Sequence, residues 1–192
     1  FLLFLLQTAP LVIAGSILSP IASSFLLVAH RTAHVLALPL NITNQLAAPQ
    51  LAQLWSQSKM NEFVQLAKLT NKISSLVGMP IFLLMIVYPD NLLALFGEDY
   101  NAARGLLIVL ACGQLINVVT GSVGYVLIVS GHEKEYKQIC FISAITTMIL
   151  TALLANGFGN IGASFALAVG TISLNVISAI VVKKRLGSWT IV

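Results

Sequence analysis

Residues 22–49 constrain the fold more than any other stretch, because they are apolar enough to cross a bilayer yet contain histidines, an arginine and several amides. In an α-helix, with about 100° between successive residues, several of these polar side chains fall within an arc of about 100°. They are His30, His34, Asn41, Asn44 and Gln45. Arg31 lies at the edge of the arc, and Pro39 lies opposite it, where we expect a kink. Ionisable groups at membrane depth usually face a bundle interior or a hydrated cavity, so this stretch predicts a polar cavity enclosed by other helices.

The low content of charged residues decides the class of protein. Only 8% of the residues are charged and 58% are hydrophobic, whereas about 25% of a soluble domain is charged. This composition predicts an integral membrane protein in contact with membrane lipids. The formal net charge is +4, but no run of lysine and arginine is typical of a nucleic-acid patch, so we expect no nucleic-acid partner.

We expect an all-α bundle of about six spans, since about 20 helical residues cross the hydrocarbon core of a bilayer. The candidate spans are 1–19, 24–46, 68–88, 103–129, 139–155 and 161–182. We interpret residues 50–69 as a loop or interfacial helix, the NGFGN sequence at 156–160 as a tight turn, and 188–192 as a cytoplasmic tail. The chain begins with Phe1 and has no basic region typical of a signal peptide, so we interpret it as a fragment whose N-terminal part is missing.

Basic residues are concentrated in alternate connections, and this pattern predicts the orientation in the membrane. The basic connections and the end of the last span contain Lys59, Lys68, Lys72, Lys134, Lys137, Lys183, Lys184 and Arg185. The opposite connections contain Asp90, Glu98 and Asp99 with Arg104, or the neutral NGFGN turn. Since basic loops are typically cytoplasmic, we expect a multi-pass protein of the cell inner membrane with both ends of the chain in the cytoplasm.

Three stretches occur in an order and spacing that resemble a known family: FLLVAHRTAHVLALPLNITNQLAAPQLAQLW, LLALFGEDYNAARGLLIVLACGQLINVVTGSVGYVLIVSGHEKE and NGFGNIGASFALAVG. Across 22–187 the chain resembles the C-terminal half of bacterial lipid-linked oligosaccharide flippases, which are polysaccharide-biosynthesis membrane proteins. The resemblance implies two six-helix lobes that face each other across a cavity, with residues 1–187 forming one lobe. It also implies alternating-access transport of an isoprenoid-diphosphate oligosaccharide across the inner membrane, for envelope, capsule or O-antigen (lipopolysaccharide) assembly.

A carrier of a diphosphate lipid needs positive charge in a hydrated cavity, and arginine keeps its charge and can bind phosphate oxygens bidentately. Arg31 occupies a position where the family commonly has arginine, so the resemblance implies a cavity role for it; the alternative is an arginine that snorkels near one bilayer face. Lys68 and Lys72 either attract the diphosphate at the cytoplasmic mouth or only set the topology. The side chains expected to exchange hydrogen bonds with sugars are Asn41, Asn44 and Gln45.

The remaining polar residues leave alternatives open. His30 and His34 lie one helical turn apart and are predicted either to pack within the bundle or to make gating sensitive to pH. No acidic or cysteine ligand accompanies them in this helix, so we expect no metal site. Gln114, Asn117 and Asn175 either hold helices together or contact the substrate.

Enzyme motifs are absent from the sequence, with no phosphate-binding glycine loop, nucleophile elbow or zinc helix, so we expect a non-enzyme without a bound cofactor. Coupling to protons or sodium stays open. Two other functions remain: a cation-coupled multidrug exporter of the same superfamily, and a non-transporting membrane scaffold of a polysaccharide assembly complex. The expected partners are the lipid-linked oligosaccharide, the N-terminal lobe and polysaccharide polymerase or other assembly proteins.

Overall fold

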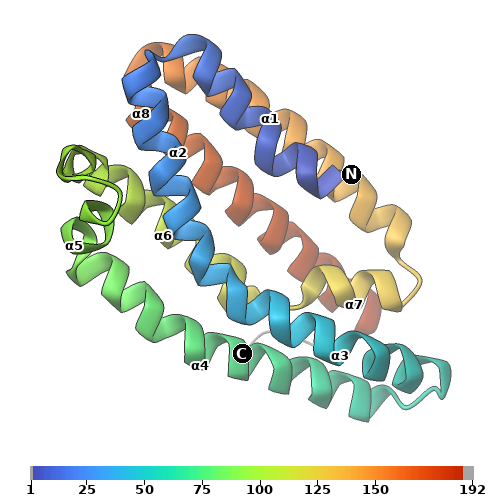
Figure 1. Ribbon diagram of the computed structural model, residues 1–192. Coiled ribbons are helices and arrows are strands. Elements are labelled where there is room, and N and C mark those ends of the chain that lie inside the picture. The colour runs from blue at the N-terminus through green and yellow to red at the C-terminus, as the bar shows by residue number, and fades with distance from the viewer. Residues whose placement is uncertain (1, 188–192) are drawn as a thin grey trace.

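A computed structural model describes residues 2–187, and every secondary-structure element in this part of the chain is helical (Figure 1). The elements are α1 (Leu2–Ile17), α2 (Pro20–His34), the 3₁₀ helix η1 (Val35–Ala37), α3 (Leu38–Ser56), α4 (Met60–Val87), α5 (Pro89–Ala94), the 3₁₀ helix η2 (Glu98–Ala103), α6 (Arg104–Thr120), α7 (Val123–Val129) and α8 (Glu133–Leu186). The predicted tail at 188–192 and the first residue of the predicted span 1–19 lie outside the described residues.

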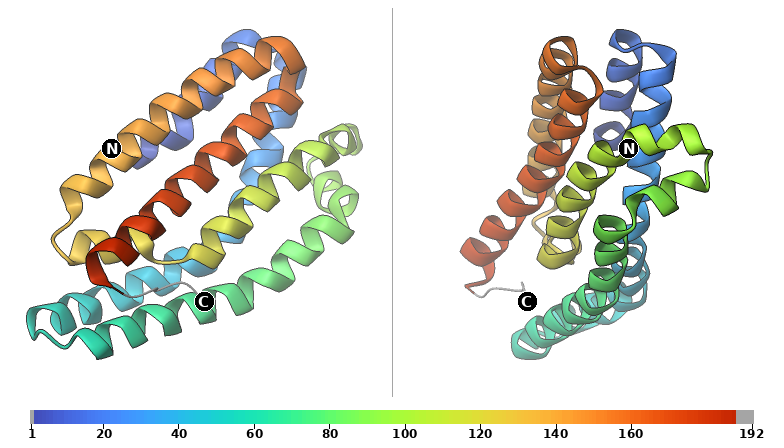
Figure 2. Two further views of the ribbon diagram at one scale, coloured as in Figure 1. Left: turned by 180° about the vertical axis from the view of Figure 1, so that it is seen from behind. Right: turned by 90° about the vertical axis from the view of Figure 1, so that its left-hand side faces the viewer.

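Four helical runs in the described part of the chain are long and apolar enough to cross a membrane. They are Pro20–Ser56, Met60–Val87, Glu98–Thr120 and Glu133–Leu186. The last run is a hairpin, because Gly159 has a non-helical backbone (φ 62°, ψ −145°) inside the NGFGN sequence and the chain reverses there (Figure 2). The first arm of this hairpin packs along α1 and the second arm packs against α6. The fold is therefore an all-helical bundle that is compatible with a membrane protein.

The helical run that contains the polar stretch is longer than the predicted span 24–46. It begins at Pro20, where the Ser19 side chain accepts a hydrogen bond from the Ala22 amide (3.3 Å), and α3 continues to Ser56. The segment expected to be a loop or interfacial helix is instead the end of α3, a short turn and the start of α4. Pro49 does not end the helix, because it removes only the hydrogen bond to the carbonyl of Gln45, an exposed residue at the helix surface.

The predicted span 103–129 is broken in two, which corrects the expectation of one continuous helix. α6 ends at Thr120, Gly121 adopts a positive φ of 72°, and α7 begins at Val123. Asn71 of α4 lies at this break: its Oδ1 accepts hydrogen bonds from the Ser122 amide (2.8 Å) and from the Ser122 hydroxyl (2.8 Å). A Cβ at position 121 would overlap the Asn71 side chain, so glycine is needed both for the backbone conformation and for the close approach.

Neighbouring helices also approach closely through small and hydroxyl residues, as is common in membrane bundles. Thr43 of α3 and Ser74 of α4 share a hydrogen bond of 2.5 Å between their hydroxyl oxygens. Gly78 of α4 faces Val118 of α6 with no room for a larger side chain, since a Cβ there would lie 2.9 Å from Cγ1 of Val118. These contacts hold α3, α4 and α6 together on one side of the bundle.

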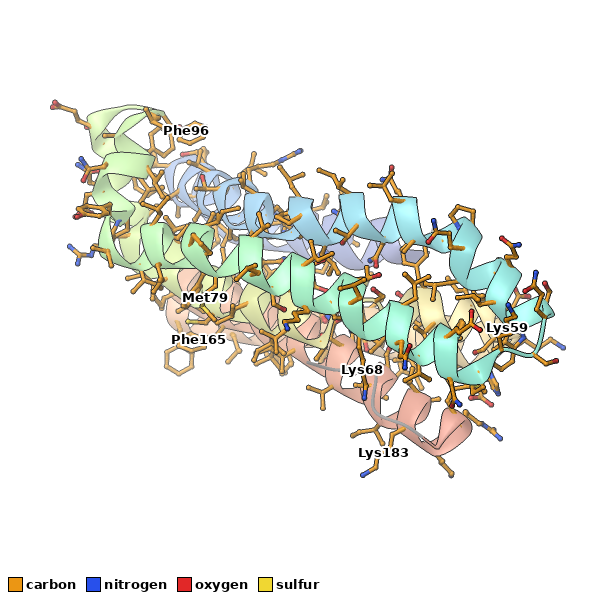
Figure 3. The ribbon with its side chains drawn as sticks, turned by 90° about the horizontal axis from the view of Figure 1, so that it is seen from below. Lys59, Lys68, Met79, Phe96, Phe165 and Lys183 are labelled. Carbon is orange, nitrogen blue, oxygen red and sulfur yellow. The ribbon has the colours of Figure 1, made fainter. Side chains whose placement is uncertain are left out.

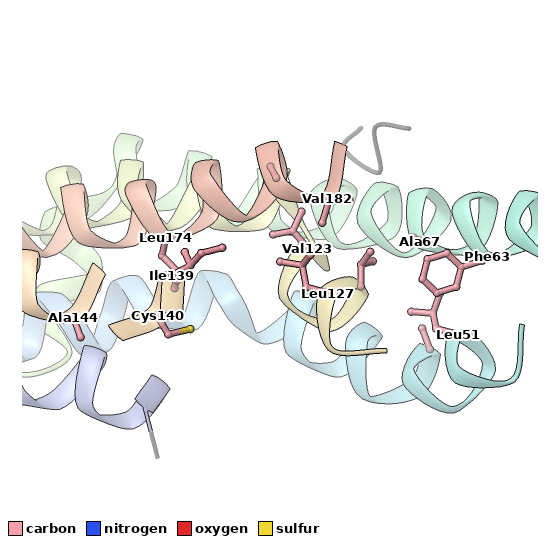
Figure 4. Packing of buried hydrophobic residues seen from close by; sticks show 13 residues of the cluster. Leu51, Phe63, Ala67, Val123, Leu127, Ile139, Cys140, Ala144, Leu174 and Val182 are labelled. Carbon is pink, nitrogen blue, oxygen red and sulfur yellow. The ribbon is translucent and has the colours of Figure 1, made fainter. Parts of the chain in front are cut away.

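The largest apolar cluster joins the end of α3 and the start of α4 to α7 and both arms of α8 (Figure 4). Phe63 and Leu51 are fully buried in it, and the ring of Trp55 packs on Phe63 with centroids 5.4 Å apart. Many large apolar side chains elsewhere on α4 and α8 are exposed, as a lipid-facing surface requires. The end of the bundle that contains the turn between α3 and α4 thus has a well-packed core, while the outer faces of α4 and α8 are apolar.

We predict that Asn71→Ala destabilises the protein by about 1–3 kcal/mol, because the Ser122 amide and hydroxyl lose their buried acceptor. Asn61→Ala is the matched control, since Asn61 lies on the same helix but is exposed. The measurement is reversible unfolding of both variants in the same detergent. Equal stability of the two variants would contradict the assigned role of Asn71.

Candidate functional site

A polar cavity of about 180 Å³ lies between the α2–η1–α3 run, the α6–α7 break and both arms of α8. Its wall combines amides, hydroxyls and imidazoles with small and apolar side chains. The lining residues are His30, His34, Ala37, Leu40, Asn41, Asn44, Gln114, Asn117, Gly121, Ser122, Gly124, Tyr125, Tyr136, Thr147, Leu167, Gly170, Thr171, Leu174 and Asn175. Most sequence-predicted site residues therefore meet in one place, although they come from segments far apart in the chain.

The cavity includes four of the polar residues predicted on the second span, His30, His34, Asn41 and Asn44. His30 and Asn44 are buried, at 9% and 5% exposure, while Asn41 lies at the exposed edge. The two imidazole rings are neighbours, with centroids 4.5 Å apart. The structure therefore places these four side chains around one cavity.

Arg31 and Gln45 are exposed and lie outside the cavity lining, which corrects the sequence-based cavity set. Arg31 follows His30 by about 100° around the helix, so its side chain leaves the cavity side. The 3₁₀ turn at Val35–Ala37 explains Gln45, because a 3₁₀ helix turns about 120° per residue and rotates the following residues by about 60° relative to an α-helix. That rotation carries Gln45 away from the cavity and Asn44 towards it.

A hydrogen-bonded chain of side chains links α2 to α6 at the cavity wall. The Gln114 Nε2 atom lies 3.4 Å from His34 Nε2 and donates to it when that ring nitrogen is unprotonated. The Asn117 Nδ2 atom donates to Gln114 Oε1 at 3.1 Å. Asn175, on the second arm of α8, donates from Nδ2 to the Thr171 carbonyl at 2.9 Å and also lines the cavity. Gln114 thus connects α6 to α2 through His34, and all three predicted residues line the cavity.

Several lining residues were not among the sequence-predicted candidates, chiefly Tyr125, Tyr136, Ser122, Thr147 and Thr171. Tyr136 lies between the predicted spans 103–129 and 139–155, whereas the structure places it in the first turns of α8. Thr147 lies one helical turn from Ser143 and Thr151, and Thr171 lies one turn from Asn175; this helical spacing of polar residues was the available signal. Ser122 gave no such signal, because it faces the cavity only through the break at the end of α6.

The cavity wall is electrically neutral apart from its histidines: no Asp, Glu, Lys or Arg occurs among its described lining residues. The described part of the chain also contains no group of three or more His, Cys, Asp or Glu residues that could hold a metal ion. Amides and hydroxyls can both donate and accept hydrogen bonds. The arrangement therefore suits a ligand with neutral hydroxyl or amide groups.

Lys68 and Lys72 are exposed on α4 and do not line the cavity. In Figure 3, Lys59, Lys68 and Lys183 lie towards one end of the bundle, whereas Phe96 lies at the other end. Ion pairs at this basic end include a two-point contact from Arg185 to Glu135, with Nη2–Oε1 at 2.5 Å and Nε–Oε2 at 3.2 Å. A role for the two lysines at a cytoplasmic mouth stays a prediction.

The fold and the cavity define an all-helical protein with helices able to cross a membrane and a neutral polar site between them. Over 130 residues the chain is 26% identical to the capsular polysaccharide biosynthesis protein CapF of Staphylococcus aureus, an alignment that covers 67% of this chain and 33% of that protein. The chain thus matches about a third of the length of this curated relative. No family model matches the chain, and no solved structure matches it. The chain is thus weakly similar to part of a protein of capsular polysaccharide biosynthesis.

We predict that a cysteine at Thr171, in the cavity wall, reacts with a hydrophilic thiol reagent, whereas a cysteine at Val169 does not. Val169 is on the same arm of α8, two residues away and exposed on the apolar outer face. The natural cysteines are first removed by Cys112→Ala and Cys140→Ala, and labelling is measured in lipid nanodiscs. Labelling of position 169 at the rate of position 171 would show that the cavity is not the hydrated side of this helix.

Proposed function

We propose that this chain is part of a flippase that translocates a lipid-linked oligosaccharide across the inner membrane for the assembly of an envelope or capsule polysaccharide. One observation carries the proposal: a neutral, hydrogen-bonding cavity lies among helices that are long and apolar enough to cross a membrane. The similarity to a capsular polysaccharide biosynthesis protein supports the same pathway. The resemblance to the flippase family supplies the mechanism, in which two lobes rock about the cavity.

Neutral cavity groups perform the physical task that such transport requires. Sugar hydroxyls that enter hydrocarbon without hydrogen-bond partners are strongly disfavoured, because no water is there to replace those lost. The amides of Asn44, Gln114 and Asn175 can exchange hydrogen bonds with these hydroxyls as water leaves. Individual neutral hydrogen bonds are weak enough to break again when the sugar is released.

The diphosphate, in this proposal, stays outside the neutral cavity and meets the exposed cations. Arg31, which is exposed outside the cavity lining, is proposed to contact the diphosphate because arginine can bind phosphate oxygens bidentately, and Lys68 and Lys72 are proposed to attract it at the cytoplasmic side. Cytoplasmic chain ends, a second lobe and polysaccharide polymerase or other assembly proteins as partners belong to the same proposal. A cation-coupled drug exporter is less favoured, because the described lining contains no carboxylate to bind a cation.

We predict that Asn44→Leu and Gln114→Leu each lower the translocation rate about tenfold, since the loss of about 1.4 kcal/mol of transition-state interaction has this effect. Gln45→Leu is the control, because Gln45 is on the same helix as Asn44 but is exposed and outside the cavity. The assay uses the complete two-lobe protein in vesicles with a fluorescent isoprenoid-diphosphate oligosaccharide and an external quencher. If both leucine variants translocate at the wild-type rate, the cavity has no role in transport.

For the diphosphate, we predict that Arg31→Ala abolishes translocation while membrane insertion stays normal, and that Arg31→Lys recovers part of the rate. Lysine retains the charge but loses the planar, two-point contact with phosphate oxygens. The three proteins are compared in the same vesicle assay after quantification of the inserted protein. If all three proteins have equal rates, Arg31 has no phosphate role. If none of them transports, the membrane scaffold or the drug exporter becomes the better proposal. A measurement of organic-cation extrusion then distinguishes these two functions.

A further inference from the structure

Building on the proposed function, we propose that the cavity is a subsite for one neutral sugar unit of the transported molecule and that it discriminates against acidic sugars. The described wall offers amides, hydroxyls and imidazoles but no lysine or arginine to pair with a carboxylate. An unpaired charge is far costlier to bury than a neutral group with hydrogen-bond partners. The subsite therefore narrows the substrate class to oligosaccharides with a neutral unit at the position that enters it.

The size of the cavity fits one sugar ring rather than a chain of them. Its volume is about 180 Å³, so it has room for several waters, since one water needs only about 10–15 Å³ of such space. Pockets for drug-sized ligands are larger, at about 300–1,000 Å³. A pyranose ring that displaces these waters must replace their hydrogen bonds, and the wall contains the groups to do so.

An unused acceptor points to such a ligand. The Oδ1 atom of Asn44 is buried and has no hydrogen-bond partner in the protein, although Asn44 is only 5% exposed and lines the cavity. A buried polar atom without a partner is costly, and a ligand hydroxyl would satisfy it. Across the cavity, Gln114 is held in place by Asn117 and His34, so it presents a fixed amide rather than a mobile one.

The wall also suits the apolar faces of a sugar ring. Leu40, Leu167 and Leu174 line the cavity beside the polar groups, as do the aromatic residues Tyr125 and Tyr136. A pyranose has C–H faces and hydroxyl edges, so a mixed wall binds it better than a uniformly polar one. A carboxylate on the same ring would face these apolar groups without a cation, which is the physical basis of the expected discrimination.

The test is protection of a cavity cysteine by free sugars. Thr171→Cys, with Cys112→Ala and Cys140→Ala, is built in the complete two-lobe protein in nanodiscs, and its modification by a thiol reagent is timed. We expect methyl α-glucoside or N-acetylglucosamine, at about twice its Kd, to slow modification about threefold by mass action. Glucuronate at equal concentration and ionic strength should leave the rate unchanged. Equal protection by neutral and acidic sugars, or protection by neither, would overturn the proposal.

A charge swap provides a second, independent readout. Asn41→Lys adds a cation at the exposed edge of the cavity without changing a buried position, and it should allow glucuronate to protect Cys at position 171. Gln45→Lys adds the same charge outside the lining and should not. Glucuronate protection that is the same in both variants would overturn the proposal, since the effect would then not come from the cavity.

The protection assay tests the sugar subsite and the translocation assay tests the flippase activity, so either proposal can be contradicted without the other. If a neutral sugar protects the cysteine but no lipid-linked oligosaccharide is moved, the subsite stands and the proposed flippase activity fails. If transport occurs and Asn44→Leu slows it about tenfold, but no sugar protects the cysteine, the flippase stands and the neutral-sugar subsite is overturned.

Discussion

Two hydrogen bonds to the Oδ1 atom of Asn71 hold the junction on which the cavity depends. A break in a membrane helix exposes backbone groups, and hydrocarbon has no water to satisfy them. Asn71 supplies the missing acceptor from α4, so α6 can end at Thr120 and the chain can resume as α7. Gly121, Ser122 and Gly124, which lie at and just after this break, line the cavity.

Neutral polar groups and charged groups occupy different parts of the bundle, because burying a charge costs more free energy than burying a neutral group with hydrogen-bond partners. Neutral amides such as Asn44, Gln114 and Asn175 are buried around the cavity, where they can find hydrogen-bond partners. The ion pairs of the described residues, such as Arg104 with Asp90, lie on exposed connections at the ends of helices. This separation leaves a neutral interior and keeps charge at the surface, and under the proposed function these would meet the sugars and the diphosphate, respectively.

Local periodicity predicts what depends on local geometry and fails where the geometry depends on distant residues. The helical arc identified His30 and His34 because both lie on the regular helix α2, and Asn44 stays on the cavity side because the 3₁₀ turn rotates it towards the cavity. It misplaced Gln45, because the 3₁₀ turn before Pro39 changes the helical phase and leaves no mark on residue spacing. The break at Gly121 was equally invisible, since it requires a partner, Asn71, fifty positions earlier in the chain.

The packing of α8 determines which parts of the bundle can move. Its arms are in direct contact where Gly170 faces Thr147, so closely that a Cβ at Gly170 would overlap the threonine side chain. The turn at Gly159 joins the arms at one end, and the contact from Arg185 to Glu135 joins them at the other. The two arms of α8 are thus held together, and we expect them to move as one unit. If the helices rock as the proposed function requires, we expect the chain to bend at the 3₁₀ turn Val35–Ala37 and at the break after α6, both of which border the cavity.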